Sequence, residues 1–122
     1  MNNMFQYNPN LTDISPLENW DVSKVKGFSN MFEYTGISDI SILENWNVSN
    51  ATNMSYMFYG DTNLTDISAL ANWDVSNVIT MTCIFANTGI IDISPLANWD
   101  TSKLSTAMNL FSNTGISDIS SL

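Results

Sequence analysis

One sequence pattern returns at a nearly fixed interval along this chain and constrains its fold more than any other feature. The phrase NWDVSNV at 72–78 has close copies at 19–25, 45–51 and 98–104. The tryptophans in these copies are spaced by 26, 27 and 26 residues, and a phenylalanine follows each one twelve residues later. The tryptophans are Trp20, Trp46, Trp73 and Trp99, and the phenylalanines are Phe32, Phe58, Phe85 and Phe111. Self-similarity at a period of about 20–50 residues is typical of stacked repeat proteins.

The repeat predicts a single solenoid domain over residues 1–122, with about four and a half coils of 26–27 residues. A coil of this length cannot bury its apolar side chains alone, so neighbouring coils must cover one another. We expect the tryptophan and phenylalanine columns to form the core, with each tryptophan lying on the next. The methionines expected to fill space around them are Met4, Met31, Met54, Met57 and Met81. We also expect a segment of a longer array, because neither end carries a polar cap.

The spacing of the apolar residues predicts the local structure of a coil. In the second coil they recur at almost every third position, with a single step of two between Trp46 and Val48. Alternation is typical of extended chain, so NWDVS is the predicted strand. Leu43, Trp46 and Val48 then have the L-x-x-L-x-L spacing of a leucine-rich repeat. The return stretch, VSNVITMTCIF at 75–85, predicts a short α or 3₁₀ segment. The predicted class is therefore α/β, with short parallel strands and short helical segments.

Two further patterns predict helix starts and chain reversals. The stretches SPLE at 15–18 and SILE at 41–44 resemble capping boxes that begin a helical turn. Glycine or asparagine stands at each expected chain reversal, where positive φ would be needed. These residues are Gly36, Gly89, Gly115, Asn10 and Asn63.

Composition excludes several classes of function. Twelve carboxylates face only three lysines, with no arginine and no histidine, so the net charge of −9 repels nucleic acid and anionic lipid surfaces. The single cysteine, Cys83, excludes an internal disulfide and a cysteine-rich metal site. The chain has no run of about 18 apolar residues, so the sequence predicts no membrane insertion. We expect no enzymatic activity, cofactor or metal, because the chain lacks a histidine base and a nucleophile pair.

The repeat units resemble the BspA-type leucine-rich repeats of bacterial surface proteins, whose units look like NWDVSNVTNMSYMF. The resemblance is carried by NWNVSNATNMSYMF at 45–58, NWDVSNVITMTCIF at 72–85 and NWDTSKLSTAMNLF at 98–111. It implies a right-handed solenoid at the cell surface or outside the cell, associated with adhesion and protein binding. The stretch TDISPLENW at 12–20 is also similar to internalin repeats. An internalin-type arrangement would shift the strand toward MSYMF.

Two sets of residues are candidate partner contacts. The outward column formed by Asp21, Asn47, Asp74 and Asp100 could bind a basic partner or a cation, or its oxygens could cap local backbone amides. The aspartates of the DIS motifs, Asp13, Asp39, Asp66, Asp92 and Asp118, pose the same alternative.

The second set varies from coil to coil, as recognition residues do on a repeating frame. It comprises Asn30, Tyr56, Cys83 and Asn109, with Tyr34 and Tyr59 nearby. Exposed tyrosines provide contact area at low entropic cost, although a scatter of exposed polar residues is also normal. The position of Cys83 in this column predicts a solvent-facing thiol. The asparagines before each tryptophan, Asn19, Asn45, Asn72 and Asn98, predict a buried amide ladder.

These observations favour a non-enzymatic binding module for a protein or a glycan on a host or bacterial surface. A structural spacer that projects another domain from the cell surface is the alternative. An ice-binding face is a third class, but the outward Thr-x-Thr columns that it needs are absent. The uncapped ends predict self-association that depends on concentration.

Overall fold

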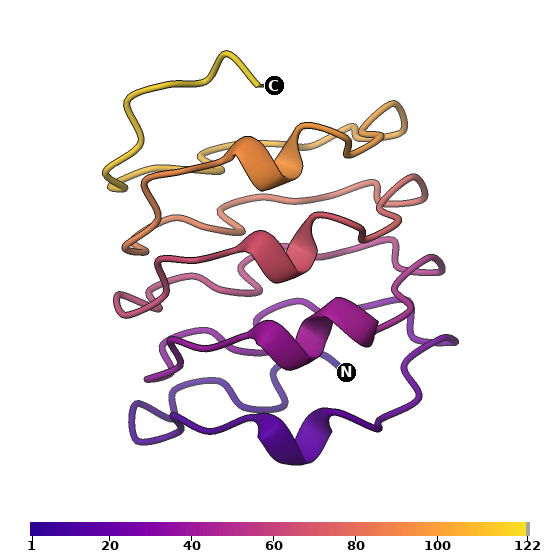
Figure 1. The fold of residues 1–122 in the computed structure, drawn as a ribbon. Helices are drawn as coiled ribbons and strands as arrows, with labels where there is room; N and C mark the ends of the chain where they lie inside the picture. Colours follow the sequence, from indigo (N-terminus) through magenta and orange to yellow (C-terminus); the bar gives the residue numbers. More distant parts are fainter. Residues whose placement is uncertain (122) are drawn as a thin grey trace.

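The computed structural model describes residues 1–121 and shows a chain wound into coils that stack along one axis (Figure 1). One side of the stack carries four short 3₁₀ helices, one above another. They are η1 (Ser15–Leu17), η2 (Ser41–Asn45), η3 (Ser68–Leu70) and η4 (Ser94–Leu96). Each helix buries one leucine against the core. The helical turns predicted within SPLE and SILE are confirmed.

An aspartate begins each helix, and the predicted capping box is wrong. The N-cap residue of η1 is Ile14, which has no side-chain oxygen to accept a hydrogen bond. Instead the backbone amide of Ser15 donates to Asp13 Oδ1 over 2.9 Å, and Ser41 donates to Asp39 Oδ1 over the same distance. The carboxylate two residues upstream therefore satisfies an amide that the capping-box serine leaves free.

The other side of each coil is a series of turns that hydrogen-bond to the next coil. Parallel bridges join Gly27, Asn53, Thr80 and Thr106 where this side begins. Beyond the bridges, the amides of every second residue donate to carbonyls one coil further on, as from Phe28 to Asn53 over 2.9 Å and from Phe32 to Met57 over 2.9 Å. The same pattern repeats over 54–60 and 81–87. We call this side the turn ladder.

The strand predicted at NWDVS is wrong. No extended strand occurs in residues 1–121, and Trp46 is only locally extended, with φ −72° and ψ 126°. The chain turns immediately after it, because Asn47 Oδ1 accepts the amide of Ser49 over 3.1 Å. The coil-to-coil main-chain bonds lie toward MSYMF instead, where the internalin-type alternative placed them.

The helical segment predicted in the return stretch is also wrong. Its amides alternate between a carbonyl three residues back, as from Met57 to Met54, and a carbonyl in the next coil, as from Tyr56 to Thr82. Tyr56 and Cys83 have φ of 59° and 54°, which lies outside the right-handed helical region. Bonding to the next coil has therefore replaced a continuous helix.

The core is built around a stack of phenylalanines. Consecutive rings are nearly parallel, with centroids 5.7, 5.8, 5.9 and 6.0 Å apart. The stack contains Phe5, Phe32, Phe58, Phe85 and Phe111. Each buried aromatic side chain removes about 150–250 Å² from water, so this column stabilises the coil-to-coil interface.

The tryptophans connect coils in a different way from the one predicted. Trp46 packs at a tilt against Phe28 and Phe32, and its aromatic ring contacts in the described chain do not include another tryptophan. Its indole N–H donates to the carbonyl of Leu17 in the preceding coil over 3.2 Å. Trp73 and Trp99 repeat this bond over 2.8 and 2.9 Å. A buried indole needs an acceptor, and the buried leucines of η1, η2 and η3 provide it.

Core positions in the outer coils are less covered than those in the middle. Trp46 and Trp73 are buried, whereas Trp20 is 40% exposed and Trp99 and Phe111 are half-buried. The methionines predicted as core lie there except Met4, which is 45% exposed. An outer coil has a neighbour on one side only within the described residues.

The glycines predicted to need positive φ are required for close packing instead. The residues with positive φ within 1–121 do not include Gly36, Gly89, Gly115, Asn10 or Asn63. A methyl group on Gly36 would collide with the carbonyl oxygen of Pro9 in the preceding coil. The left-handed positions lie in the turn ladder, where Gly60 has φ 76°.

Candidate functional site

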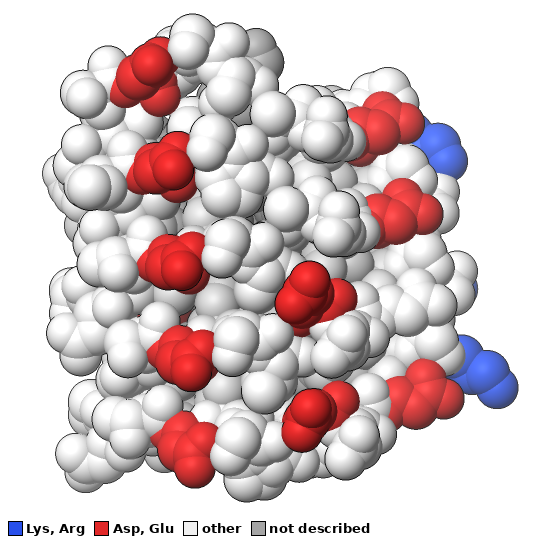
Figure 2. All heavy atoms as spheres, viewed as in Figure 1, with Lys and Arg blue, Asp and Glu red and all other residues white. Residues whose placement is uncertain are grey.

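The helix side of the solenoid carries acidic side chains in columns that run across the coils (Figure 2). The helix-start column comprises Asp13, Asp39, Asp66, Asp92 and Asp118. The tryptophan column comprises Asp21, Asp74 and Asp100, with Asn47 in the second coil. All of these side chains are exposed. Together they give this side a continuous negative potential.

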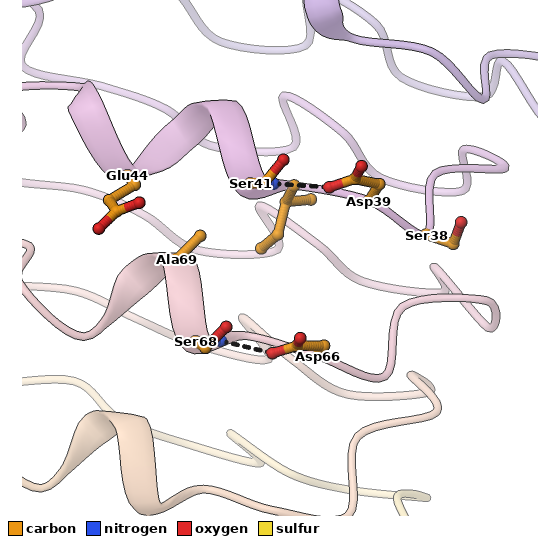
Figure 3. A pocket seen from close by; sticks show the side chains of 8 residues that line it. Ser38, Asp39, Ser41, Glu44, Asp66, Ser68 and Ala69 are labelled. Atoms are coloured by element: carbon orange, nitrogen blue, oxygen red, sulfur yellow. Dashed lines mark hydrogen bonds between the residues drawn. The ribbon is translucent and has the colours of Figure 1, made fainter.

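A hollow of about 410 Å³ lies in the acidic side between η2 and η3. Figure 3 shows Asp39 and Asp66 on successive coils beside it, each bound to the serine that follows. The backbone amides and hydroxyls of Ser41 and Ser68 stabilise the two carboxylates and hold their pKa below the usual range. Both groups are therefore anionic at neutral pH. No group of three or more possible metal-ligating side chains occurs within residues 1–121.

The tryptophan column also satisfies its own backbone. Asp21, Asp74 and Asp100 each accept the amide of the serine two residues later over 3.0 Å. The serine hydroxyls and amides lower the pKa of all three aspartates. These carboxylates are thus turn-forming residues that remain charged and exposed.

The four tyrosines of the chain, which are Tyr7, Tyr34, Tyr56 and Tyr59, gather on the turn ladder into one cluster. Tyr7 and Tyr34 are stacked, with centroids 5.5 Å apart and planes at 15°. Tyr34 meets Tyr59 edge to face at 5.3 Å and 89°, and Tyr59 meets Tyr56 at 5.6 Å and 72°. Tyr7 is 63% and Tyr34 is 40% exposed. We call this group the tyrosine cluster.

Three tyrosines of the cluster have a backbone conformation that disfavours bulky side chains. Tyr7, Tyr34 and Tyr56 have φ of 58°, 53° and 59°. The left-handed region costs an ordinary residue roughly 1–2 kcal/mol and is tolerated best by glycine and asparagine. Later coils carry asparagine at the matching positions, as at Asn87 and Asn109, with φ of 57° and 54°. The tyrosines are therefore not there to ease the turn.

A buried carboxylate lies among the tyrosines. Glu33 is only 5% exposed, and its oxygens accept hydrogen bonds from the side-chain amides of Gln6 and Asn30 and from the Tyr7 hydroxyl. These donors are uncharged, so none of them neutralises the carboxylate. The pKa of Tyr34 is raised, first by its hydrogen bond with Tyr59 and, among smaller causes, by the negative charge of Glu33.

An open hollow of about 640 Å³ adjoins the cluster. Its lining includes Tyr7, Tyr34, Thr62 and Gly60, and none of its lining residues is charged. The Tyr34 ring lies so close to Gly60 that a methyl group there would approach it to 2.5 Å. The absence of a side chain at Gly60 therefore leaves both the ring position and the hollow open.

The structure brings some of the predicted contact residues together and separates others. Tyr34, Tyr56 and Tyr59 pack against one another. Asn30 donates to Glu33, which also accepts the hydroxyl of Tyr7 in the same cluster. Asn109 lies on the last turn of the ladder, two coils beyond Tyr56, and is exposed. The predicted solvent-facing thiol is wrong, since Cys83 is only 8% exposed. Its position in the ladder is left-handed, but the side chain turns toward Tyr56, whose pKa it raises.

The buried amide ladder predicted before the tryptophans is wrong. Asn19, Asn45, Asn72 and Asn98 are all exposed, because they lie at the end of a helix or just after it, at the surface. The hydrogen bonds that asparagine side chains make between coils come instead from the asparagine after the serine of the repeat. Asn50 Nδ2 donates to the Ser23 carbonyl over 2.7 Å, and Asn77 Nδ2 donates to the Ser49 carbonyl over 2.8 Å.

Two buried acidic residues near the cluster were not predicted from the sequence. Glu33 lies between Phe32 and Tyr34, and no sequence pattern singles it out. Asp61 is fully buried, with Oδ1 accepting the amide and hydroxyl of Thr35 over 2.7 and 2.9 Å, and with Oδ2 unpartnered. Burial raises its pKa to about 8. The sequence signal for Asp61 is the length of its turn, because YGDTN at 59–63 has one residue more than EYTG at 33–36.

Stacked coils, a parallel turn ladder and one short helix per coil define a leucine-rich-repeat-like solenoid. An internalin (inlF) from Listeria monocytogenes is similar to this chain, with 27% identity and a TM-score of 0.55. The similarity covers 92% of this chain and 34% of the internalin, so this chain spans about a third of that protein. A second internalin (inlC2) from the same species has 22% identity and a TM-score of 0.38, covering 96% of this chain and 63% of its own.

Residues 34–120, more than half of the chain, match a family described as "Mycoplasma protein of unknown function, DUF285". The protein belongs to this family. A search of curated proteins found no match. Within residues 1–121, no helix is long and apolar enough to cross a membrane.

Proposed function

We propose that this solenoid is a non-enzymatic protein-binding module of a bacterial surface or secreted protein, and that the tyrosine cluster is its main contact site. The observation that carries the proposal is the left-handed backbone at Tyr7, Tyr34 and Tyr56. Asparagine would satisfy the turn at lower cost, as it does in later coils. Exposed tyrosines retained against this cost are characteristic of a recognition surface.

The acidic side supports association with a basic partner. Its eight aspartates remain charged because their serines lower their pKa, and the whole chain carries a net charge of −9. A field of one sign raises the rate at which an oppositely charged partner is encountered. The acidic columns would steer the partner, and the tyrosine cluster would provide the close contact.

The resemblance to BspA-type repeats is compatible with this proposal and with a location at the cell surface. A glycan ligand is a second candidate, favoured by the uncharged hollow beside Tyr34 and Gly60. The absence of enzymatic activity remains part of the proposal. So does self-association of the isolated chain, which would bury the half-exposed Trp20 and Phe111 rings at its two ends.

The decisive experiment compares binding by the wild-type chain and by a double variant, Tyr34→Asn with Tyr56→Asn. Asparagine suits the left-handed backbone, so these changes remove two rings without straining the turn. Labelled wild-type protein should bind host cells or matrix proteins saturably, and the double variant should lose most of this binding. Asn98→Ala is the control, since it changes an exposed, uncharged residue that belongs neither to the cluster nor to the acidic columns. Equal binding by wild type and double variant would contradict the proposal and favour a spacer.

A further inference from the structure

The rings of the tyrosine cluster form two walls at right angles. Tyr34 and Tyr59 are perpendicular, and Tyr56 stands at 72° to Tyr59. Tyr59 and Tyr56 are partly exposed, and Tyr34 borders the uncharged hollow at Gly60. Rings set at right angles present faces and edges to the same space, and an aromatic face attracts a cation through its quadrupole.

The negative charge of Glu33 strengthens this attraction. The carboxylate is buried, so water screens it poorly, and its hydrogen-bond donors are neutral. The raised pKa of Tyr34 comes first from its hydrogen bond with Tyr59 and that of Tyr56 first from Cys83, and the negative charge of Glu33 is a smaller cause of both. A buried carboxylate without a cationic partner is unfavourable, and a positive ligand held over the rings would offset that cost.

The remainder of the chain points to the same class of ligand. The lysines, Lys24, Lys26 and Lys103, lie in other parts of the coils and are exposed. None of them lines the hollow beside the cluster, and neither does a carboxylate. The net charge of −9 raises the local concentration of cations around the protein as a whole.

We infer that the tyrosine cluster, together with the neighbouring carboxylate of Glu33, binds a cationic side chain of a basic protein partner, with the arginine guanidinium as its preferred form. The planar guanidinium stacks on aromatic faces and is less strongly hydrated than an ammonium group. This inference rests on the proposed function and names the chemistry of the partner at that site.

The test is a titration of the full ¹⁵N-labelled chain, followed by amide chemical shifts at low and constant ionic strength. The probes are the peptide acetyl-Gly-Arg-Gly-amide, its citrulline counterpart, which is uncharged and of the same shape, and tetramethylammonium chloride. The arginine peptide should give saturable shifts at Tyr34, Thr35 and Gly60, with affinity at least about fivefold above that of the citrulline peptide. Equal affinities, or shifts confined to the acidic side, would overturn the inference. Binding of tetramethylammonium alone would exclude a protein-borne cation.

Two variants distinguish binding at the tyrosine cluster from a general attraction of the acidic protein for cations. Glu33→Gln and Glu44→Gln each remove one negative charge, but Glu44 is exposed beside η2, away from the cluster. Affinity for the arginine peptide should fall about three- to tenfold in Glu33→Gln and less than about twofold in Glu44→Gln. Tyr59→Leu, which keeps the bulk but removes the ring, should weaken binding even if Glu33→Gln disturbs local folding. An equal effect of the two glutamine variants, together with unchanged binding by Tyr59→Leu, would refute cation binding at the tyrosine cluster.

The outcomes also distinguish this inference from the proposed function. Loss of cell binding by the tyrosine-to-asparagine double variant without local shifts from the arginine peptide would leave the binding module standing and reject the cationic ligand. Local, charge-dependent peptide binding without any saturable binding to cells or matrix proteins would support cation binding at the tyrosine cluster. It would reject the proposed role as a protein-binding module.

Discussion

Replacing Asp61 with asparagine is predicted to remove most of the pH dependence of stability between pH 5 and 8. The side chain is fully buried in the turn after Phe58. Its Oδ1 accepts two bonds from Thr35, while Oδ2 has no partner. Asparagine keeps the accepting oxygen and cannot ionise. The first coil already carries asparagine at the matching position, Asn8.

The magnitude follows from the pKa of Asp61. Burial raises this pKa from 3.8 to about 8 in the folded protein. The folded state therefore keeps a proton that the unfolded chain releases, so the contribution to stability is full below the unfolded pKa. It is lost as the pH rises toward 8. One pKa unit corresponds to about 1.4 kcal/mol, so the free energy of unfolding should fall by up to about 4 kcal/mol between pH 5 and pH 8.

Urea unfolding, followed by tryptophan fluorescence at pH 5, 6, 7 and 8, measures this effect. The window is favourable because the chain has no histidine, whose titration would otherwise overlap it. Asp66→Asn is the matched control, with the same change of charge at an exposed position. Wild type and Asp66→Asn should lose stability as the pH rises, whereas Asp61→Asn should stay nearly constant. If Asp61→Asn keeps the wild-type slope, the reasoning about burial is wrong.

Three substitutions and one labelling experiment test the packing and the hydrogen bonds of the coils. Phe58→Ala should lower the free energy of unfolding by about 3–5 kcal/mol in urea titrations, because it interrupts the ring stack, and a loss below 1 kcal/mol would contradict that role. Trp73→Phe should cost about 1–3 kcal/mol by leaving the Leu43 carbonyl without its indole donor; a neutral effect would show that this bond is unimportant. Gly36→Ala should destabilise the fold by about 1–3 kcal/mol through its collision with the preceding coil, and unchanged thermal unfolding would argue against close packing there. The Cys83 thiol should react with a maleimide only after denaturation, so rapid labelling of the native chain would be inconsistent with its burial.

The side chains that form the tyrosine cluster show how a solenoid assembles a site from residues far apart in sequence. Tyr7, Tyr34 and Tyr59 come from three successive coils, and each coil supplies a ring at or beside the same ladder position. The coil period brings the ring centroids of Tyr7 and Tyr34 to 5.5 Å and those of Tyr34 and Tyr59 to 5.3 Å, so no local motif marks the site. The differences between coils mark Tyr34, Tyr56 and Tyr59 as variable, but they do not reveal the buried carboxylate of Glu33.

The period, the inward columns of phenylalanine and the helix starts followed from the sequence. Trp46, Phe58 and Leu43 recur in register, and apolar side chains that repeat at one interval are buried together when the coils stack. An aspartate followed two residues later by serine has a local hydrogen bond available whatever the remainder of the chain does. These features depend on short-range chemistry and on repetition alone.

The hydrogen-bonding side of the coil was decided only by the tertiary structure. Alternating apolar residues at Trp46 and Val48 predicted a strand, but a main-chain ladder also needs a neighbouring segment in register, and the turn at Asn47 prevents one there. The turn ladder obtains its partners from the next coil, which forces Tyr56 and Cys83 into left-handed conformations that no propensity favours. Burial of Glu33 and Asp61 likewise depends on which coils cover them, because desolvation is a property of the packed neighbours and not of the residue itself.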